Sequence, residues 1–391
     1  MPIRNLIILF VCQLISATGQ ITIVTLGGII GSSLTENQSF ATLPVSLMVV
    51  VTAISTIPAT MLMKKMGRKY GSSISSLSAV AAVLIAAFAL IKSSFLMFIF
   101  AAALFGINTA FTQQYRFAAA ESVQSKYTAR AISIVLLGAI GGALLGPELV
   151  IRGQYWYEGA QYSGTLLALS VLFVFQAILL LFLGSLKVNH NSTNKSQVRS
   201  INHIIKQPVF IMAVFGATIA YGSMTFIMTA TPLSMHVIDG YSINITANII
   251  RSHVLAMYIP SLFSGLLIEK FGTVKIMSVG ALSLLGACLC GFEGQAVNNY
   301  WIALVLLGVG WNFLYIGGTT MLTFTYATEE RFKVQGINEL CIFGTSAVGS
   351  LLAGTIMYIY GWFSLVILPI PFLLLVLLGL YITKNNQLLT Q

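Results

Sequence analysis

Residues 361–383 read GWFSLVILPIPFLLLVLLGLYIT, a run without a single Asp, Glu, Lys or Arg. An α-helix that crosses the apolar core of a bilayer needs roughly 20 such residues. Sheet edges and irregular backbone cannot face lipid, because their polar groups would stay unpaired there. This run therefore predicts a membrane-spanning helix.

The rest of the chain repeats this pattern. Of its 391 residues 57% are hydrophobic and only 8% are charged, and the mean hydropathy is +0.91. Too little polar surface remains to cover a water-soluble globule, so we expect the bilayer to be the solvent. Apolar runs predict spans at about 5–30, 41–63, 71–91, 94–118, 131–151, 164–186, 208–231, 245–268, 276–294, 299–323, 336–359 and 361–383.

A polar segment rich in Asn, Ser, Thr and Gln separates the sixth run from the seventh. Such a composition cannot build an apolar core. We therefore predict an N-terminal six-helix bundle at 1–186, a cytoplasmic linker at 187–207 and a C-terminal six-helix bundle at 208–391. The first apolar run is too long for the core of a signal peptide, so we expect it to be the first span.

The positively charged residues predict the orientation of the chain. Lys and Arg near span ends are retained on the cytoplasmic side. With the N-terminus inside, only Lys92, Arg152 and Arg251 fall on the outer side, so both termini are expected in the cytoplasm. The net charge of +10 comes from short clusters rather than a continuous stripe, so we expect no nucleic-acid partner.

Two short segments echo each other after the second and the eighth predicted span. They read Lys64-Lys65-Met66-Gly67-Arg68-Lys69 and Glu269-Lys270-Phe271-Gly272-Thr273-Val274-Lys275. Internal repeats of this kind are common in secondary transporters. The echo predicts an internal duplication.

With these turns the chain resembles the major facilitator superfamily, whose members have a short Gly-and-basic turn after the second helix of each half. In the first half Gly67, Arg68 and Lys69 fit, but Lys64 stands where the family usually has an acid and Thr60 where it usually has Gly. The resemblance implies an all-α integral membrane fold, with twelve transmembrane helices in two pseudo-symmetric six-helix bundles. The second half matches the family pattern at Gly265, Leu267, Glu269, Lys270, Phe271 and Gly272.

Other stretches resemble particular branches of this superfamily. Tyr115-Arg116-Phe117-Ala118-Ala119-Ala120-Glu121 and Gly310-Trp311-Asn312-Phe313 resemble a bacterial branch that includes riboflavin uptake permeases. Gly142-Ala143-Leu144-Leu145-Gly146-Pro147 resembles the signature of antiporters that export drugs and metabolites, although the glycine pair that usually follows the proline is missing. The direction of transport is therefore open at this stage.

In this family, helices one, four, seven and ten line the central cavity, so polar residues near their midpoints are candidates for binding substrate. Asn108, Thr112 and Tyr115 recur at helical spacing and predict one polar stripe on an otherwise apolar helix. Aromatic residues with polar tips suit a neutral or heteroaromatic solute. The alternative role of such residues is to hold helices together. The predicted substrate-binding set is Gln13, Gln20, Asn108, Thr112, Tyr115, Tyr221, Thr225, Trp311, Asn312 and Tyr315.

Charged groups inside a membrane are costly and usually mark a function or an ion pair. Glu148 and Arg251 are expected near the outer surface as an outer gate pair. Lys64 and Glu339 are expected near the cytoplasmic side as an inner gate pair, since a lysine against the positive N-terminus of a helix needs a neutralising acid. The alternative is that these side chains meet lipid head groups or water. The predicted coupling or gating set is Arg116, Glu148, Arg251, His253, Lys64 and Glu339.

These features favour a secondary active transporter of a small organic solute that works by alternating access, coupled to protons, with riboflavin-like uptake as one form. The alternative is a proton antiporter that exports a drug or metabolite; short loops disfavour a passive channel or a receptor. An enzyme is not expected, because the four His and ten acidic residues are scattered. We expect a monomer in a bacterial inner membrane, a small-molecule substrate, the proton as coupling ion, and no cofactor, metal or disulfide.

Overall fold

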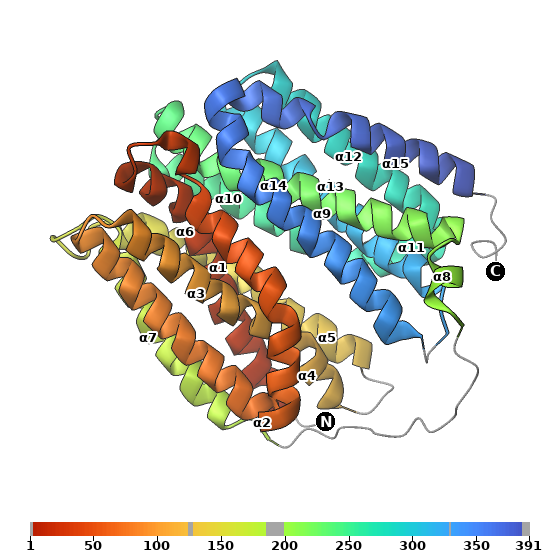
Figure 1. Cartoon of the computed structure of the whole chain (residues 1–391), viewed down its shortest axis with the longest axis horizontal. Helices are drawn as coiled ribbons and strands as arrows, with labels where there is room; N and C mark the ends of the chain where they lie inside the picture. Colours follow the sequence, from red (N-terminus) through yellow and green to blue (C-terminus); the bar gives the residue numbers. More distant parts are fainter. Residues whose placement is uncertain (1–2, 124–127, 185–198, 328–329, 385–391) are drawn as a thin grey trace. The chain divides into compact units, whose positions relative to one another are not determined.

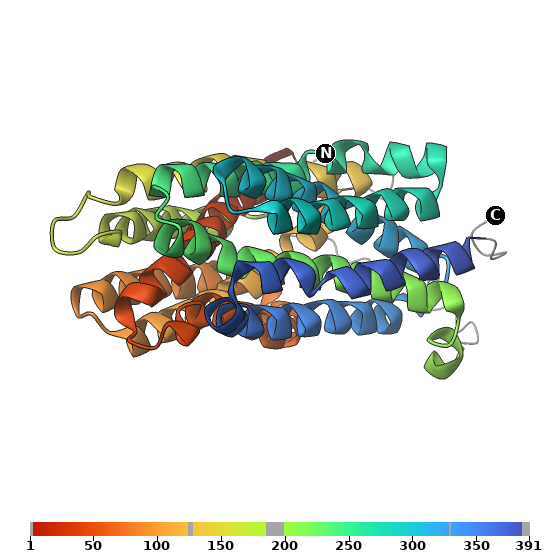
Figure 2. The same cartoon turned by 90° about the horizontal axis from the view of Figure 1, so that it is seen from above.

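The computed structural model describes residues 3–123, 128–184, 199–327 and 330–384, and these residues form helices and turns without a strand. The predicted all-helical fold class is confirmed. The chain divides into two compact units, Met1–His190 with Thr229–Arg251 and Asn191–Met228 with Ser252–Gln391. The predicted linker at 187–207 lies largely outside the described residues, so its boundaries stay a prediction. Figures 1 and 2 show that within each unit the long helices run side by side.

The first unit is built around α1, which contacts each of the α-helices α2 to α7. Within this unit α2 packs against both α3 and α7. The elements of this unit are α1 (Ile3–Leu34), η1 (Gln38–Phe40), α2 (Leu43–Ile91), α3 (Phe95–Thr112), α4 (Tyr115–Glu121), α5 (Thr128–Leu136), α6 (Gly138–Gly153), α7 (Ser163–Leu181) and the π-helical turn η3 (Leu233–Ile238).

In the second unit α12 takes the central place and contacts α11, α13, α14 and α15. Along the chain, α9 passes into the first unit at Thr229 and α10 returns to the second unit at Ser252. The helices are α8 (Ile201–Ile204), α9 (Pro208–Pro232), α10 (Ile243–Tyr258), α11 (Ser261–Phe271), α12 (Thr273–Glu293), α13 (Val297–Thr323), α14 (Arg331–Ile367) and α15 (Ile370–Thr383).

The candidate membrane spans are consistent with the sequence prediction without confirming its count of twelve. Among the described residues ten helices are long and apolar enough to cross a membrane, and α10 with α11, bent by 41°, makes an eleventh span. The longest candidate, Lys333–Thr383, has 51 residues, which at about 1.5 Å each is more than twice the roughly 30 Å bilayer core. It is interrupted at Gly361, whose φ of 75° and ψ of 179° are not helical. If this long helix is counted as two spans divided at Gly361, the structure is consistent with twelve spans.

The two turns that echo each other in sequence also share a backbone geometry. Gly67 interrupts α2 with φ 82° and ψ 155°, and Gly272 separates α11 from α12 with φ 84° and ψ 152°. This region is essentially restricted to glycine, because a Cβ would meet the backbone there. Each glycine thus lets the chain reverse between two spans.

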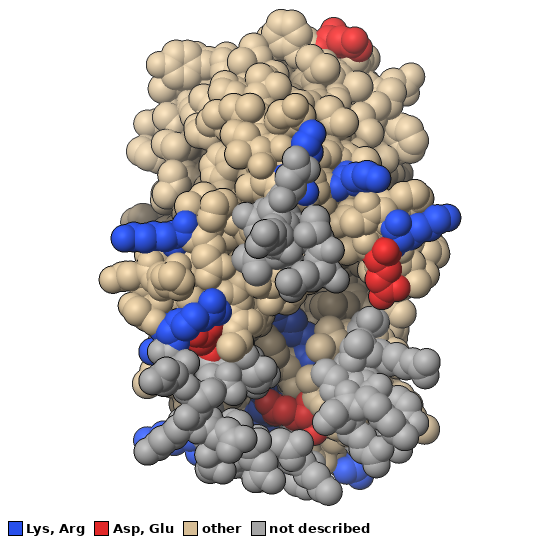
Figure 3. Space-filling view, turned by 90° about the vertical axis from the view of Figure 1, so that its right-hand side faces the viewer, with Lys and Arg blue, Asp and Glu red and all other residues tan. Residues whose placement is uncertain are grey.

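The outward faces of the helices are apolar, with large exposed side chains such as Ile54, Leu96 and Val171. In water an apolar surface of this extent would be a liability, whereas lipid tails require it. In Figure 3 the Lys and Arg side chains stand in separate groups, several beside an acidic neighbour.

Candidate substrate site

The polar stripe predicted on the fourth span lies in the interior of the first unit. Asn108 and Thr112 lie on α3, Tyr115 begins α4, and all three side chains are buried. The Asn108 amide donates to the backbone oxygen of Ser75 at 3.0 Å and to its hydroxyl oxygen at 3.2 Å. Because Ser75 lies on α2, this amide ties two neighbouring helices together.

Thr112 and Tyr115 belong to a hydrogen-bonded group with Ser16 of α1 and Gln176 of α7. The Thr112 hydroxyl donates to the Ser16 hydroxyl at 3.1 Å. The Gln176 amide donates to the same hydroxyl at 3.0 Å and to the Tyr115 phenol oxygen at 2.8 Å. Sequence reasoning missed Gln176, although it is the one amide in its apolar helix. This group uses its hydrogen-bonding capacity to join helices.

Gln13 and Gln20 of α1 are in a different state. Both side chains are half-buried, and their spacing places them on one face of the helix. Within the described ranges neither amide has a hydrogen-bond partner. Their role in binding a solute stays a prediction.

An aromatic cluster, Tyr221, Tyr258, Trp311, Tyr315 and Phe343, lies in the second unit. Tyr221 of α9 lies edge-on to Trp311 and Tyr315 of α13, with ring centroids 5.3 and 5.2 Å apart. Trp311 and Tyr315 stack at 5.2 Å with 16° between their planes. Tyr258 of α10 lies 6.2 Å from Trp311, and Phe343 of α14 lies 5.9 Å from Tyr221. The structure brings three predicted residues together and adds two from helices that were not expected to line the cavity.

Asn312 follows Trp311 in the chain but is occupied elsewhere. Its buried amide donates to the backbone oxygen of Met257 at 2.7 Å and to the Ser261 hydroxyl at 2.5 Å. Its oxygen accepts from the Ser264 hydroxyl at 2.6 Å. Asn312 thus holds α13 to the bend between α10 and α11. The remaining predicted residue, Thr225, is buried one turn along α9 from Tyr221.

Glu148 of α6 and Arg251 of α10, both in the first unit, form an ion pair with 3.0 Å between Oε2 and Nη2. Glu148 also accepts a hydrogen bond from Nε of Arg152, one turn further along α6. The side chains of Glu148 and Arg251 are 38% and 25% exposed, so the pair is partly shielded from solvent. Their role as a gate stays a prediction.

His253 is buried on α10, with Nδ1 at 2.8 Å from the backbone oxygen of Leu304 on α13. A carbonyl oxygen only accepts, so Nδ1 carries a proton and Nε2 of the neutral ring is an acceptor. Nε2 is buried and has no hydrogen-bond partner in the described residues. The coupling role of His253 stays a prediction.

The other predicted coupling residues lie apart from these. Arg116 of α4 is half-buried, with its guanidinium 4.9 Å from the centre of the Phe117 ring. Glu339 is half-buried on α14. The side chain of Lys64 lies outside the described residues, so its pairing with Glu339 stays a prediction.

Sequence reasoning missed an ion pair in the first unit between the Gly67 turn and the end of α4. Nε and Nη2 of Arg68 each lie 2.5 Å from a different carboxylate oxygen of Glu121. The side chains are only 20% and 29% exposed. Two parallel bonds of this kind fix orientation as well as distance.

A second missed pair lies in the second unit, between Arg199 and Glu330. The Glu330 carboxylate, 3% exposed, accepts from Nη2 of Arg199 at 2.7 Å and from the backbone N–H groups of Arg199 and Ala327 at 2.8 and 2.9 Å. Hydrogen bonding to the Arg199 guanidinium, aided by these backbone groups, lowers the pKa of Glu330 to about 2. The same contact raises the pKa of Arg199. The sequence did contain a signal for this pair, since Glu330 follows the tenth span as Glu121 follows the fourth.

The model of the Major Facilitator Superfamily matches residues 9–259 and again 214–388, which together span nearly the whole chain. The chain belongs to this superfamily. The chain is 36% identical over 378 residues to the riboflavin transporter RfnT of Brucella anthropi, and the match covers 96% of this chain and 95% of the relative. It is 22% identical over 196 residues to the methylenomycin A resistance protein of Bacillus subtilis, covering 48% of this chain and 38% of the relative.

Among solved structures, an inward-facing bacterial homologue of the human lysosomal transporter Spinster shares the fold of this chain. The TM-score is 0.74 at 13% identity, over 98% of each chain. Membership confirms the predicted resemblance to the superfamily and to its riboflavin-transporting branch. The protein is therefore a multi-pass membrane transporter of a small molecule and not an enzyme.

The predicted substrate residues of this chain fall into two groups. Asn108, Thr112, Tyr115 and Asn312 have hydrogen bonds that join helices of their own unit. The other group consists of two amides in the first unit and three aromatic residues in the second, and their contact with a substrate stays a prediction. These are Gln13, Gln20, Tyr221, Trp311 and Tyr315.

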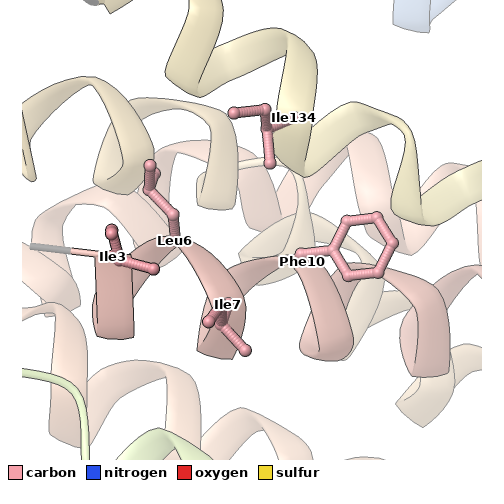
Figure 4. A pocket seen from close by; sticks show the side chains of 5 residues that line it. All are labelled: Ile3, Leu6, Ile7, Phe10 and Ile134. Carbon is pink, nitrogen blue, oxygen red and sulfur yellow. The ribbon is translucent and has the colours of Figure 1, made fainter. Parts of the chain in front are cut away.

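An apolar pocket of about 380 Å³ lies at the start of α1 (Figure 4). It is lined by Ile3, Leu6, Ile7 and Phe10 of α1 and by Ile134 of α5. These side chains offer neither a donor nor an acceptor to a polar solute. We therefore do not assign the pocket to the substrate.

Proposed function

We propose that this transporter carries riboflavin, or a solute with a similarly flat heteroaromatic ring, into the cell. The observation that carries the proposal is the 36% identity, over nearly the full length, to a protein named a riboflavin transporter. The aromatic cluster supports it, because the π faces of Tyr and Trp suit a planar ring. The half-buried amides of Gln13 and Gln20 supply donors and acceptors for polar groups of such a solute.

In this proposal the aromatic residues Tyr221, Trp311 and Tyr315 contact the ring of the substrate. Thr225, on the same helix as Tyr221, adds a hydroxyl group beside them. The residues whose hydrogen bonds are made within a unit act on the substrate only through the helices that they join. These are Asn108, Thr112, Tyr115 and Asn312.

We further infer that transport proceeds by alternating access, with Glu148 and Arg251 as the outer gate and Lys64 and Glu339 as the inner gate. Each pair stabilises one state, since that state makes a contact that the other state lacks. The 3.0 Å contact between Glu148 and Arg251 supports the proposed outer gate.

The proton is the proposed coupling ion. Glu148, His253 and Glu339 are the candidates to carry it, and the buried acceptor Nε2 of His253 favours that residue. Arg116 is proposed to hold the cytoplasmic end of the fourth span. The protein is proposed to work as a monomer in a bacterial inner membrane, with both termini in the cytoplasm.

The alternative function is a proton antiporter that exports a drug or metabolite. The Gly-and-Pro run at 142–147 and the partial similarity to a methylenomycin A resistance protein favour it. Helix packing accounts for these glycines, however. A Cβ at Gly142 would lie 2.5 Å from that of Ala17, and one at Gly146 would lie 3.1 Å from that of Ile21. Close approach of α6 to α1 therefore explains the run without an export signature.

The purified protein in liposomes tests substrate and coupling together. Labelled riboflavin, and then a panel of other solutes, is offered with and without an inward proton gradient. Accumulation that collapses with a protonophore supports proton-coupled uptake of riboflavin. Gradient-driven movement of another solute in the opposite sense, without riboflavin flux, would favour export.

The outer gate is tested in the same vesicles by exchanging its charges. Glu148→Arg and Arg251→Glu should each slow transport, and the double variant should recover part of the rate. Arg152→Ala removes a neighbouring contact of Glu148 and is the matched control, because the pair with Arg251 remains. A double variant as slow as either single variant would count against the gate.

A further inference from the structure

The tryptophans of the second unit differ in the state of their indole N–H. Trp301 donates to the Ser252 hydroxyl at 3.1 Å, and Trp362 donates to the backbone oxygen of Gly291 at 2.9 Å. Trp311 is buried, with 5% of the residue exposed, and its Nε1 has no acceptor in the part of the chain that the structure describes. Trp311 thus holds a buried donor that the protein itself leaves unsatisfied.

Such a donor is unfavourable for the folded protein. A buried N–H loses its bond to water, and without a new acceptor that loss is not offset. Unsatisfied buried groups are therefore rare and require an explanation, such as a ligand or an ordered water. A phenylalanine at this position would keep an aromatic ring and avoid the penalty.

The surroundings of Trp311 are aromatic. Tyr315 stacks on one face of the indole, and Tyr221 and Tyr258 lie edge-on to it. The adjacent amide, Asn312, has its oxygen bonded to Ser264. The hydroxyl oxygens of the three tyrosines can also accept, but none of them is bonded to Nε1 among the described residues. The rings around the indole are suited to contact a flat solute.

We propose that the Trp311 N–H selects substrates that carry a hydrogen-bond acceptor on the edge of a flat ring. The inference rests on the proposed riboflavin transport and names the residue that sets its specificity. The ring system of riboflavin carries such acceptors at N1, N5 and the oxygens on C2 and C4. A flat solute without an acceptor leaves the N–H unsatisfied in the complex, so the site discriminates against it.

A combined set of protein and ligand variants tests this role. Trp311→Phe removes the N–H but keeps a ring. Its uptake kinetics in proteoliposomes are compared with those of the wild type for riboflavin and four analogues, each with one ring-edge acceptor removed or weakened. The analogues are 1-deaza-, 5-deaza-, 2-thio- and 4-thioriboflavin. Trp301→Phe is the matched control, because it removes an N–H of the same helix that already has a partner.

We expect Trp311→Phe to raise the KM for riboflavin about tenfold, the value of one hydrogen bond, with little change in kcat. The wild type should show a similar rise for one analogue, and Trp311→Phe should add no further loss for that analogue. A merely structural role would affect all five ligands equally. Trp301→Phe should leave each KM within about twofold of the wild type.

Two results would overturn the inference while leaving riboflavin transport intact: an unchanged riboflavin KM in Trp311→Phe, or the same rise for all five ligands. In either case an ordered water satisfies the indole. A wild type that takes up neither riboflavin nor any analogue overturns the proposed function and this inference together. Should Trp311→Phe fail to fold, 3-benzothienylalanine at position 311 makes the same test, because sulfur replaces the N–H in a side chain of nearly equal shape.

Discussion

The fourth and the tenth spans hold equivalent places in the two halves of the chain, yet they use their polar residues differently. On α3, Asn108 and Thr112 have their side chains bonded inside the first unit. On α13, Asn312 is bonded in a similar way, but Trp311 beside it has a donor without an acceptor in the described part of the chain. A polar residue in a membrane helix therefore indicates substrate contact only when its own bundle leaves a donor or acceptor available.

The segments that follow the same two spans make a second comparison. Glu121 pairs with Arg68, from the turn between the second and third spans. In the second half Thr273 stands at the position equivalent to Arg68, and Glu330 pairs instead with Arg199 from the segment that joins the halves. The halves thus share the acid and differ in the source of the base.

The largest effect is expected from Arg199→Ala, which leaves the carboxylate of Glu330 without its guanidinium. Hydrogen bonds to a charged group are worth about 1.5–3 kcal/mol, and we expect the upper end, about 3 kcal/mol, because the Glu330 side chain is only 3% exposed although that of Arg199 is 43% exposed. Thermal unfolding of the purified protein measures the loss. Lys275→Ala, at an exposed lysine, is the control and should be nearly neutral.

A transplanted base sharpens this comparison. Thr273→Arg, added to Arg199→Ala, supplies the charge from the position that Arg68 holds in the first half. If position 273 is equivalent to position 68 of the first half, the double variant regains part of the lost stability. A double variant no more stable than Arg199→Ala would show that the turn in the second half cannot reach Glu330.

The same pair has a pH dependence with a defined sign. The pKa of Glu330 is lowered from its ordinary value of 4.5 to about 2. A lowered carboxyl pKa contributes stability that is present above pH 4.5 and is lost as the pH falls towards 2. The difference in melting temperature between wild type and Arg199→Ala should therefore be full at pH 7 and smaller at pH 3. An equal difference at both values would contradict the assignment to this carboxylate.

The next largest effect concerns the turns that the halves share. Gly67→Ala and Gly272→Ala each place a Cβ where nothing lies within 4 Å, so only the positive φ opposes it. This conformation costs about 1–3 kcal/mol for a residue other than glycine, and we expect about 2 kcal/mol for each variant. Melting curves should show equal losses, while Gly265→Ala, inside a helix with open space beside it, loses nothing. Unequal losses would mean that the two turns are not true repeats.

The sequence predicted the fold well because the bilayer imposes a length and a polarity on each span. The predicted gap between spans at 63 and 71 contains Gly67, and the one between 359 and 361 ends at Gly361, where the backbone leaves the helix. The site was harder to predict, since periodicity identifies the face of a helix but not its neighbour. Gln176 and the pair of Arg199 with Glu330 act across contacts that no local pattern contains.

The smallest expected effect on stability distinguishes a bonded amide of the first unit, Gln176, from an unbonded one, Gln13. It directly tests the comparison between bonded and unbonded polar residues. Gln176→Leu removes hydrogen bonds to Ser16 and Tyr115, worth roughly 0.6 kcal/mol each between membrane helices, so we expect a loss of about 1 kcal/mol. Gln13→Leu removes no bond among the described residues, so its stability should stay within about 0.5 kcal/mol of the wild type. Its KM for riboflavin should rise instead, because a donor and an acceptor offered to the substrate are gone. The reverse outcome, a raised KM for Gln176→Leu and a lowered melting temperature for Gln13→Leu, would mean that bonded amides reach the substrate after all.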